Sequence, residues 1–239
     1  MGGRRVDTAD FLLEALVIAT VAAAQLAYVL LWTRRSRRVG AALSLAVIAG
    51  AASALAVAPL NIYVEGIVGY KTLAVFYAPI FEECLKYGSL LLLVTAFGKE
   101  LRGASEVSYP HIGMAAGTVF MLLERFTDAT ASSLGLTLTS LQEIPVHPVT
   151  TGLASLSIIG GRPTRRAAIL LPAAIALHAA FNFSLQSSSL TQLPYVWTVL
   201  LEGFWVAFLL MGFIFRKANP FSRGKKAACP QQPLTNLRV

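Results

Sequence analysis

Two adjacent glutamates, Glu82 and Glu83, and a lysine, Lys86, stand inside an otherwise apolar run that extends from residue 72 to residue 97. A helix over this run is long enough to cross a bilayer. One charged side chain at the centre of a membrane costs about 2.5–3.5 kcal/mol on insertion scales, so three together need internal partners or a chemical role. The run therefore restricts the fold to one that shields these charges from lipid.

The composition of the whole chain agrees with a membrane protein. Hydrophobic residues make up 56% of the sequence and charged residues only 13%, whereas a soluble domain carries about 25% charged residues. The net charge of +8 does not indicate a nucleic-acid partner, because the basic residues stand in short segments between apolar runs. The lipid bilayer is the expected environment, and the cell membrane the expected location.

The pattern predicts an all-α fold, a polytopic transmembrane helix bundle of about seven spans. The seven apolar runs cover residues 11–32, 41–62, 72–97, 110–128, 144–160, 167–186 and 195–215. We expect residues 1–218 to form the integral membrane domain. Residues 219–239, which are basic and contain prolines, are expected to form a disordered cytoplasmic tail.

The distribution of basic residues predicts the orientation of the bundle. The segments after the first, third, fifth and seventh runs hold 15 of the 20 lysines and arginines. These four segments lie on one side of the membrane if there are seven spans. Positive charge marks the cytoplasmic side, so we expect the N-terminus outside and the C-terminus in the cytoplasm.

The spacing of the three charges in the third run limits how they can pair. Consecutive helical residues differ by about 100° in direction, so Glu82 and Glu83 cannot face the same way. Lys86 lies four residues after Glu82 and three after Glu83, within reach of either carboxylate. We therefore expect one glutamate to pair with Lys86 and the other to face a cavity. Such an ion pair could serve helix packing alone, but it leaves the second glutamate without a partner.

Other runs supply candidate partners at compatible depths. His178 and Asn182 are four residues apart in the sixth run and project from one face of a helix. His147 stands in the outer half of the fifth run and Glu124 toward the outer end of the fourth. Polar residues inside a membrane are costly and usually functional, so we expect these side chains to share one cavity. Glu202, near the middle of the seventh run, has no assigned role.

Four motifs in successive runs resemble those of the PrsW-type intramembrane proteases. This family is related to the CAAX-prenyl endopeptidases and to bacteriocin-processing membrane enzymes. The resemblance covers about residues 72–187. The matching motifs are Ala78-Pro79-x-x-Glu82-Glu83-x-x-Lys86, Gly113-x-x-x-Gly117-x-x-Phe120-x-x-x-Glu124, His147 followed by Thr150-Thr151-Gly152, and His178-x-x-Phe181-Asn182. The family usually continues its fourth-run glutamate with asparagine and a later tyrosine, where this chain has Arg125 and Asp128.

The resemblance implies an endopeptidase that hydrolyses a peptide bond of a membrane-anchored protein. Bacterial relatives make the first cut, at site 1, in a single-span anti-sigma factor, which makes such a factor one candidate substrate. No cofactor is implied, because a glutamate activates the attacking water and no covalent intermediate forms. A carboxylate in a water-poor cavity is suited to this general-base role.

The same resemblance suggests a role for each candidate residue. Glu82 is the expected base, with Glu83 as the alternative. His147 is expected to help hold the water. Glu83 is expected to act in support through Lys86, with Glu124 as a second supporting residue. His178 and Asn182 are expected to donate to the developing oxyanion.

Two other readings of these residues remain open. One glutamate and two histidines can ligate zinc, which would give a metal-dependent membrane protease, although the chain has no His-Glu-x-x-His helix. The carboxylates could instead form an ion or proton pathway, or the protein could be a membrane receptor without enzymatic activity. Loss of substrate cleavage in Glu82→Gln and His178→Ala variants would separate the protease from the non-enzymatic readings.

Overall fold

The structure is a computed structural model that describes residues 8–33, 39–97, 109–131, 144–159, 162–186, 203 and 206–210. This part of the chain is mostly helical, as the apolar runs predict. Its elements are α1 (Thr8–Thr33), α2 (Val39–Val68), α3 (Tyr70–Thr72), the π-helix η1 (Leu73–Tyr77), α4 (Ala78–Ala96), α6 (Tyr109–Ala131), α8 (Val146–Ser155), β1 (Ile158–Ile159), β2 (Arg162–Pro163) and α9 (Ala167–Gln186). Residues 206–210 are also helical. The predicted tail at 219–239 and Glu202 lie outside the described residues.

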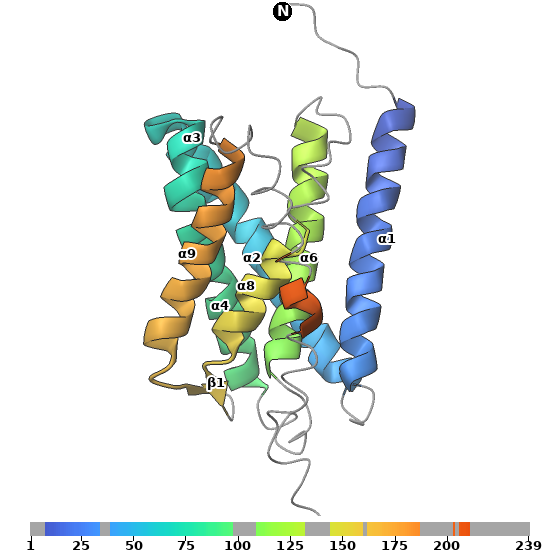
Figure 1. Ribbon diagram of the computed structural model, residues 1–239, viewed down its shortest axis with the longest axis vertical. Coiled ribbons are helices and arrows are strands. Elements are labelled where there is room, and N and C mark those ends of the chain that lie inside the picture. Colours follow the sequence, from blue (N-terminus) through green and yellow to red (C-terminus); the bar gives the residue numbers. More distant parts are fainter. Residues whose placement is uncertain are drawn as a thin grey trace, which may run out of the picture.

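The long helices stand side by side as one bundle (Figure 1). α6 packs against α1, α2 and α8, while α9 packs against α4, α8 and η1. The core between these helices is built mostly from alanine, valine, leucine and isoleucine side chains, with a few aromatic ones. Each helix that carries candidate residues therefore contacts at least two of the others.

Two helices have the length and the apolar composition needed to cross a membrane, over residues Gly40–Val68 and Ala167–Ser184. The segment Ile18–Leu31 of α1 is a shorter apolar helix. The α-helical fold class is confirmed, whereas these features alone do not establish seven spans.

The expected span at residues 144–160 has a different structure. α8 contains only 10 residues, which corresponds to a length of about 15 Å, half of a typical hydrocarbon core. The chain then forms a small antiparallel hairpin in which Ile158 pairs with Pro163 and Ile159 with Arg162. Hydropathy alone did not distinguish a complete span from a short helix that is apolar because other helices surround it.

Glycines on α6 bring α8 unusually close. A Cβ atom at Gly117 would collide with the backbone of His147 and Pro148, and one at Gly113 would collide with Ser155 and the carbonyl of Thr151. The Gly113-x-x-x-Gly117 spacing thus allows a close contact between the two helices. It sets the depth and direction of His147, the second residue of α8.

The third apolar run is a helix with a local change of pitch. Gly69 has a φ of 79°, a conformation that favours glycine, and it separates α2 from α3. The next residues continue as α3, then the five-residue π-helix η1, then α4. The change of pitch ends at Tyr77, two residues before Pro79 and shortly before the two glutamates.

Candidate active site

Four helices contribute to one buried polar cluster. α4 carries Glu82, Glu83 and Lys86, while α8 carries His147, α9 carries His178 and α6 carries Glu124. Glu82, Glu83, Lys86 and both histidines are buried, with at most 3% of each residue exposed. Buried charged groups are costly unless partners compensate them, so the contacts within this cluster decide what each residue can do.

One oxygen of the Glu83 carboxylate, Oε1, has three hydrogen-bond partners. Its Oε1 atom accepts hydrogen bonds from Lys86 Nζ at 2.7 Å and from Thr150 Oγ1 at 2.8 Å. His178 Nδ1 lies 2.9 Å from the same oxygen. Three donors on one atom hold Glu83 in place, so this glutamate serves as the structural centre of the cluster.

His147 connects Lys86 to Glu124. Its Nδ1 atom lies 2.9 Å from Lys86 Nζ, and its Nε2 atom lies 2.9 Å from Glu124 Oε2. An ammonium group can only donate and a carboxylate can only accept, which assigns the imidazole proton to Nε2. His147 is thus oriented on both ring nitrogens.

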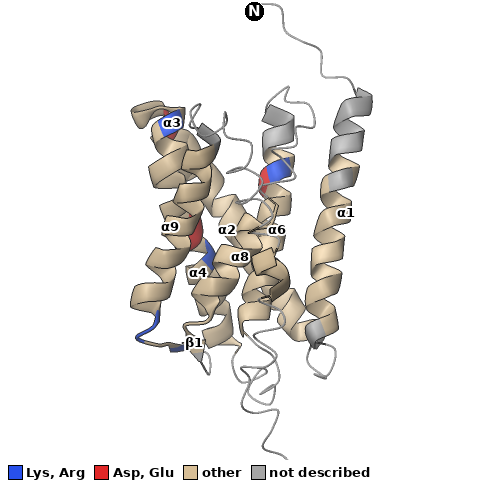
Figure 2. Cartoon of the chain, viewed as in Figure 1, with Lys and Arg blue, Asp and Glu red and all other residues tan. Residues whose placement is uncertain are grey.

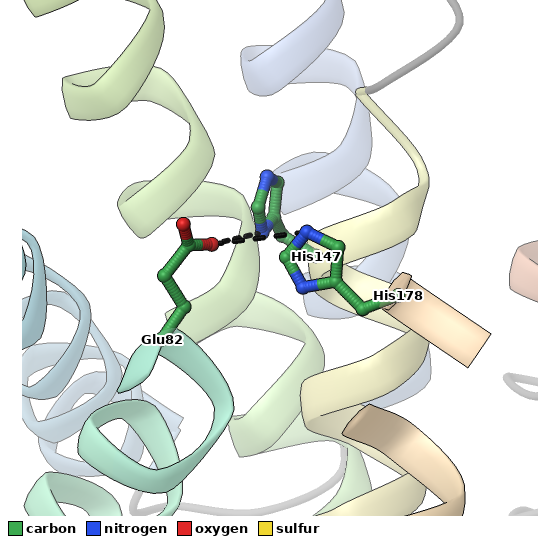
Figure 3. A group of neighbouring side chains, drawn as sticks. All are labelled: Glu82, His147 and His178. Carbon is green, nitrogen blue, oxygen red and sulfur yellow. Dashed lines mark ion pairs between the residues drawn. The ribbon is translucent and has the colours of Figure 1, made fainter. Parts of the chain in front are cut away.

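Glu82 has a different environment from its neighbour. Its Oε2 atom lies 3.8 Å from His147 Nδ1 and 3.8 Å from His178 Nε2 (Figure 3). Both separations exceed hydrogen-bond length, and this buried oxygen has no hydrogen-bond partner among the described residues. Glu82 therefore directs an unsatisfied carboxylate oxygen toward the two histidines.

The two histidine rings meet edge to face beside Glu82. Their centroids are 4.9 Å apart with an interplanar angle of 90°. Because the Glu83 carboxylate accepts from His178 Nδ1, the Nε2 atom of neutral His178 carries a lone pair on the side of Glu82. A carboxylate oxygen and two imidazole nitrogens thus face a common point.

The same three atoms meet the basic geometric requirement of a metal site. One ligand atom from each of Glu82, His147 and His178 lies within 4.8 Å of the others, compared with about 3.3 Å in an ideal tetrahedral zinc site. The remaining nitrogen of each histidine contacts a carboxylate, Glu124 or Glu83, and metal-binding histidines are usually oriented by such a contact. Against a metal, the Lys86 ammonium donates to His147 Nδ1.

Asn182 makes its hydrogen bond to the backbone and not to these side chains. Its amide nitrogen donates to the carbonyl of Ala74 in η1, at 2.8 Å. The structure therefore brings together six of the seven predicted catalytic and supporting residues, Glu82, Glu83, Lys86, Glu124, His147 and His178. It gives Asn182 a backbone contact that the spacing did not predict.

Two side chains of the cluster were not among the predicted site residues. Thr150 stands one turn after His147 and donates to Glu83, and the ring of Phe120 lies 4.4 Å from Lys86 Nζ. Phe120 also packs against His147, with ring centroids 5.2 Å apart. The three-residue spacing from His147 could have identified Thr150. Phe120 stands in the Gly113-x-x-x-Gly117-x-x-Phe120-x-x-x-Glu124 motif, which could have identified it.

Comparisons with protein-family models, curated protein sequences and solved structures gave no match. The family resemblance thus rests on the four motifs and their order along the chain.

Proposed function

We propose that this protein is a multi-pass membrane protein of the cell membrane that acts as an intramembrane endopeptidase on a membrane-anchored protein substrate. One observation carries the proposal: Glu82 Oε2, buried and without a hydrogen-bond partner among the described residues, faces two oriented histidines. Membership of the PrsW-type family is part of the proposal and is supported by the ordered motifs.

The exposed surface of the helices supports the membrane part of the proposal. Leu55, Ile62 and Ile169 expose 75%, 72% and 71% of their surface, which is costly in water for so many large side chains but not in lipid. Basic residues lie along the connection between α8 and α9, at the end of the bundle opposite α3 (Figure 2). Seven crossings with the N-terminus outside fit this arrangement, the fifth being made through the short α8.

The cluster suggests how hydrolysis would proceed. A water between Glu82 and the histidines transfers a proton to Glu82 Oε2 while its oxygen attacks the carbonyl carbon of the scissile bond. The protonated Glu82 then donates that proton to the leaving amide nitrogen as the carbon–nitrogen bond breaks. His147, held by Lys86 and Glu124, forms one wall of the water site. His178 donates to the developing oxyanion when its Nε2 atom carries a proton.

Cleavage of a co-expressed single-span substrate tests this function. Glu82→Gln removes the base and His178→Ala removes the proposed oxyanion donor, so each variant should abolish the cleavage product while the protein still accumulates in the membrane. Glu65→Gln is the matched control, because Glu65 is an exposed glutamate at the end of α2. Retention of cleavage by both site variants would refute the assignment.

A zinc-dependent protease is the second candidate, favoured by the carboxylate partners on the outer nitrogens of both histidines. Glu82, His147 and His178 would hold the ion, which when bound would polarise the attacking water and the substrate carbonyl. The Lys86 contact with His147 Nδ1 favours the metal-free reaction. We expect full activity after treatment with a strong chelator and no stoichiometric zinc in the purified protein. Loss of activity on chelation, restored by added zinc, would instead establish the metal enzyme.

A further inference from the structure

The π-helix before the two glutamates leaves one backbone carbonyl without its donor. At the end of η1 the N–H of Ala78 bonds to the carbonyl of Leu73, five residues earlier. In the same register the nitrogen of residue 79 would bond to the carbonyl of Ala74. Residue 79 is proline, which has no N–H. The Ala74 carbonyl must therefore find a donor elsewhere or remain unsatisfied inside the bundle.

Asn182 on α9 supplies that donor. Its amide nitrogen lies 2.8 Å from the Ala74 carbonyl oxygen. A side-chain donor from a neighbouring helix is one of the ways in which a proline-freed carbonyl is satisfied in a membrane protein. Pro79 and Asn182, 103 positions apart in the sequence, are thus linked through one carbonyl group.

The contact between Asn182 and the Ala74 carbonyl affects the glutamates because the π-helix lies directly before them in the chain. A π-turn accommodates one extra residue, which rotates everything after it by about 100° relative to an uninterrupted α-helix. Adjacent glutamates differ by the same angle, so the π-helix determines which of them occupies the position between the two histidines, here Glu82.

α9 contacts this helix on both sides of Pro79. Asn182 bonds to Ala74 before the proline, and His178, one turn away on α9, contacts Glu83 after it. The two contacts fix the rotation of α4 against the helix that carries His178.

We propose that Asn182 is a positioning residue that stabilises the π-helix by satisfying the carbonyl freed by Pro79, and thereby holds Glu82 toward His147 and His178. The inference rests on the proposed protease function for its activity readout only. It differs from the oxyanion role that the family resemblance implies for Asn182, and the two roles make opposite predictions for one pair of variants.

The test is a double-mutant cycle with Asn182→Ala and Pro79→Ala, measuring both the turnover of a single-span substrate and thermal unfolding in detergent. In the wild-type background Asn182→Ala should lower kcat at least tenfold, change KM less than twofold and lower the unfolding temperature. Pro79→Ala returns an N–H to the Ala74 carbonyl, so in that background Asn182→Ala should change both quantities little, with kcat within twofold. Asn182→Gln, which keeps an amide donor, should recover part of the lost kcat.

Ser184→Ala is the control on the same helix, since Ser184 donates only to the carbonyl of Phe181 within α9. Its effect should be the same in both backgrounds. If Asn182→Ala is equally harmful with and without Pro79, in unfolding temperature as well as in turnover, the positioning role is wrong. The unfolding cycle decides the question even if the protein cleaves nothing or Pro79→Ala is inactive, which separates failure of this inference from failure of the proposed function.

Discussion

Adjacent glutamates of one helix have different surroundings, although the Oε2 atom of each is buried without a hydrogen-bond partner among the described residues. Glu83 Oε1 is held by Lys86, Thr150 and His178, while Glu82 Oε2 lies beyond hydrogen-bond length from both histidines. A carboxylate oxygen without hydrogen-bond partners, such as Glu82 Oε2, keeps its lone pairs available for a proton donor such as water. Glu83 is fixed and Glu82 is available because neighbouring residues of a helix point about 100° apart.

The hydroxyl groups of Thr150 and Thr151 provide a matched test of the fixed carboxylate. Thr150→Val removes the donor to Glu83 and should destabilise the protein by about 1.5–3 kcal/mol, the usual value for a hydrogen bond to a charged group. Thr151 Oγ1 is buried and has no hydrogen-bond partner among the described residues, so Thr151→Val should be neutral or stabilising. Equilibrium unfolding in detergent gives both values, and equal losses in the two variants would contradict the role given to Thr150.

At the scale of elements, the cluster depends on how closely α8 approaches α6. His147 is the second residue of α8, and its backbone lies directly against Gly117. The contact between His147 and Glu124 also crosses this interface, at 2.9 Å. Any side chain at residue 117 would have to displace the backbone that carries the histidine.

We expect Gly117→Ala to reduce substrate cleavage at least tenfold and to destabilise the protein by about 1–3 kcal/mol, the usual cost of overpacking. Gly88→Ala is the control, because a Cβ atom at this exposed position of α4 meets nothing within 4 Å. It should leave cleavage unchanged and leave stability unchanged or slightly higher. Normal cleavage by Gly117→Ala would show that the close approach is not needed to place His147.

At the scale of the whole molecule, the two ends of the bundle differ in charge. Arg162, Arg165 and Arg166 are exposed at the end that carries the β1–β2 hairpin. Lys71 is exposed in α3 at the opposite end (Figure 1). The proposed orientation places the first end in the cytoplasm and the second outside.

Single-cysteine labelling tests that orientation. In a variant with Cys84→Ser and Cys229→Ser, Lys71→Cys should react with a membrane-impermeant maleimide in intact cells. Arg162→Cys should react only after the membrane is permeabilised, because it lies at the cytoplasmic end. Reaction of both positions in intact cells would contradict the membrane topology.

The sequence predicted some of these features and missed others for identifiable physical reasons. The pairing of Lys86 with a glutamate follows from three- and four-residue spacing, which the helix fixes locally. The contact of His147 with Glu124 depends on how α6 and α8 pack, which local spacing does not encode. The π-helix was missed because one extra residue hardly changes an apolar pattern, and the position of Asn182 could not be predicted without it. The short α8 was missed because hydropathy does not distinguish a protein environment from lipid.

The central claim is that Glu82 acts as the general base, and reconstitution tests it most directly. Purified wild type, Glu82→Gln and Glu65→Gln would be placed in liposomes with a purified single-span substrate, and initial cleavage rates would be compared. We predict a loss of about 10²–10⁴-fold for Glu82→Gln, the usual contribution of general acid–base catalysis, and no change for Glu65→Gln. A Glu82→Gln rate within tenfold of wild type would contradict the account.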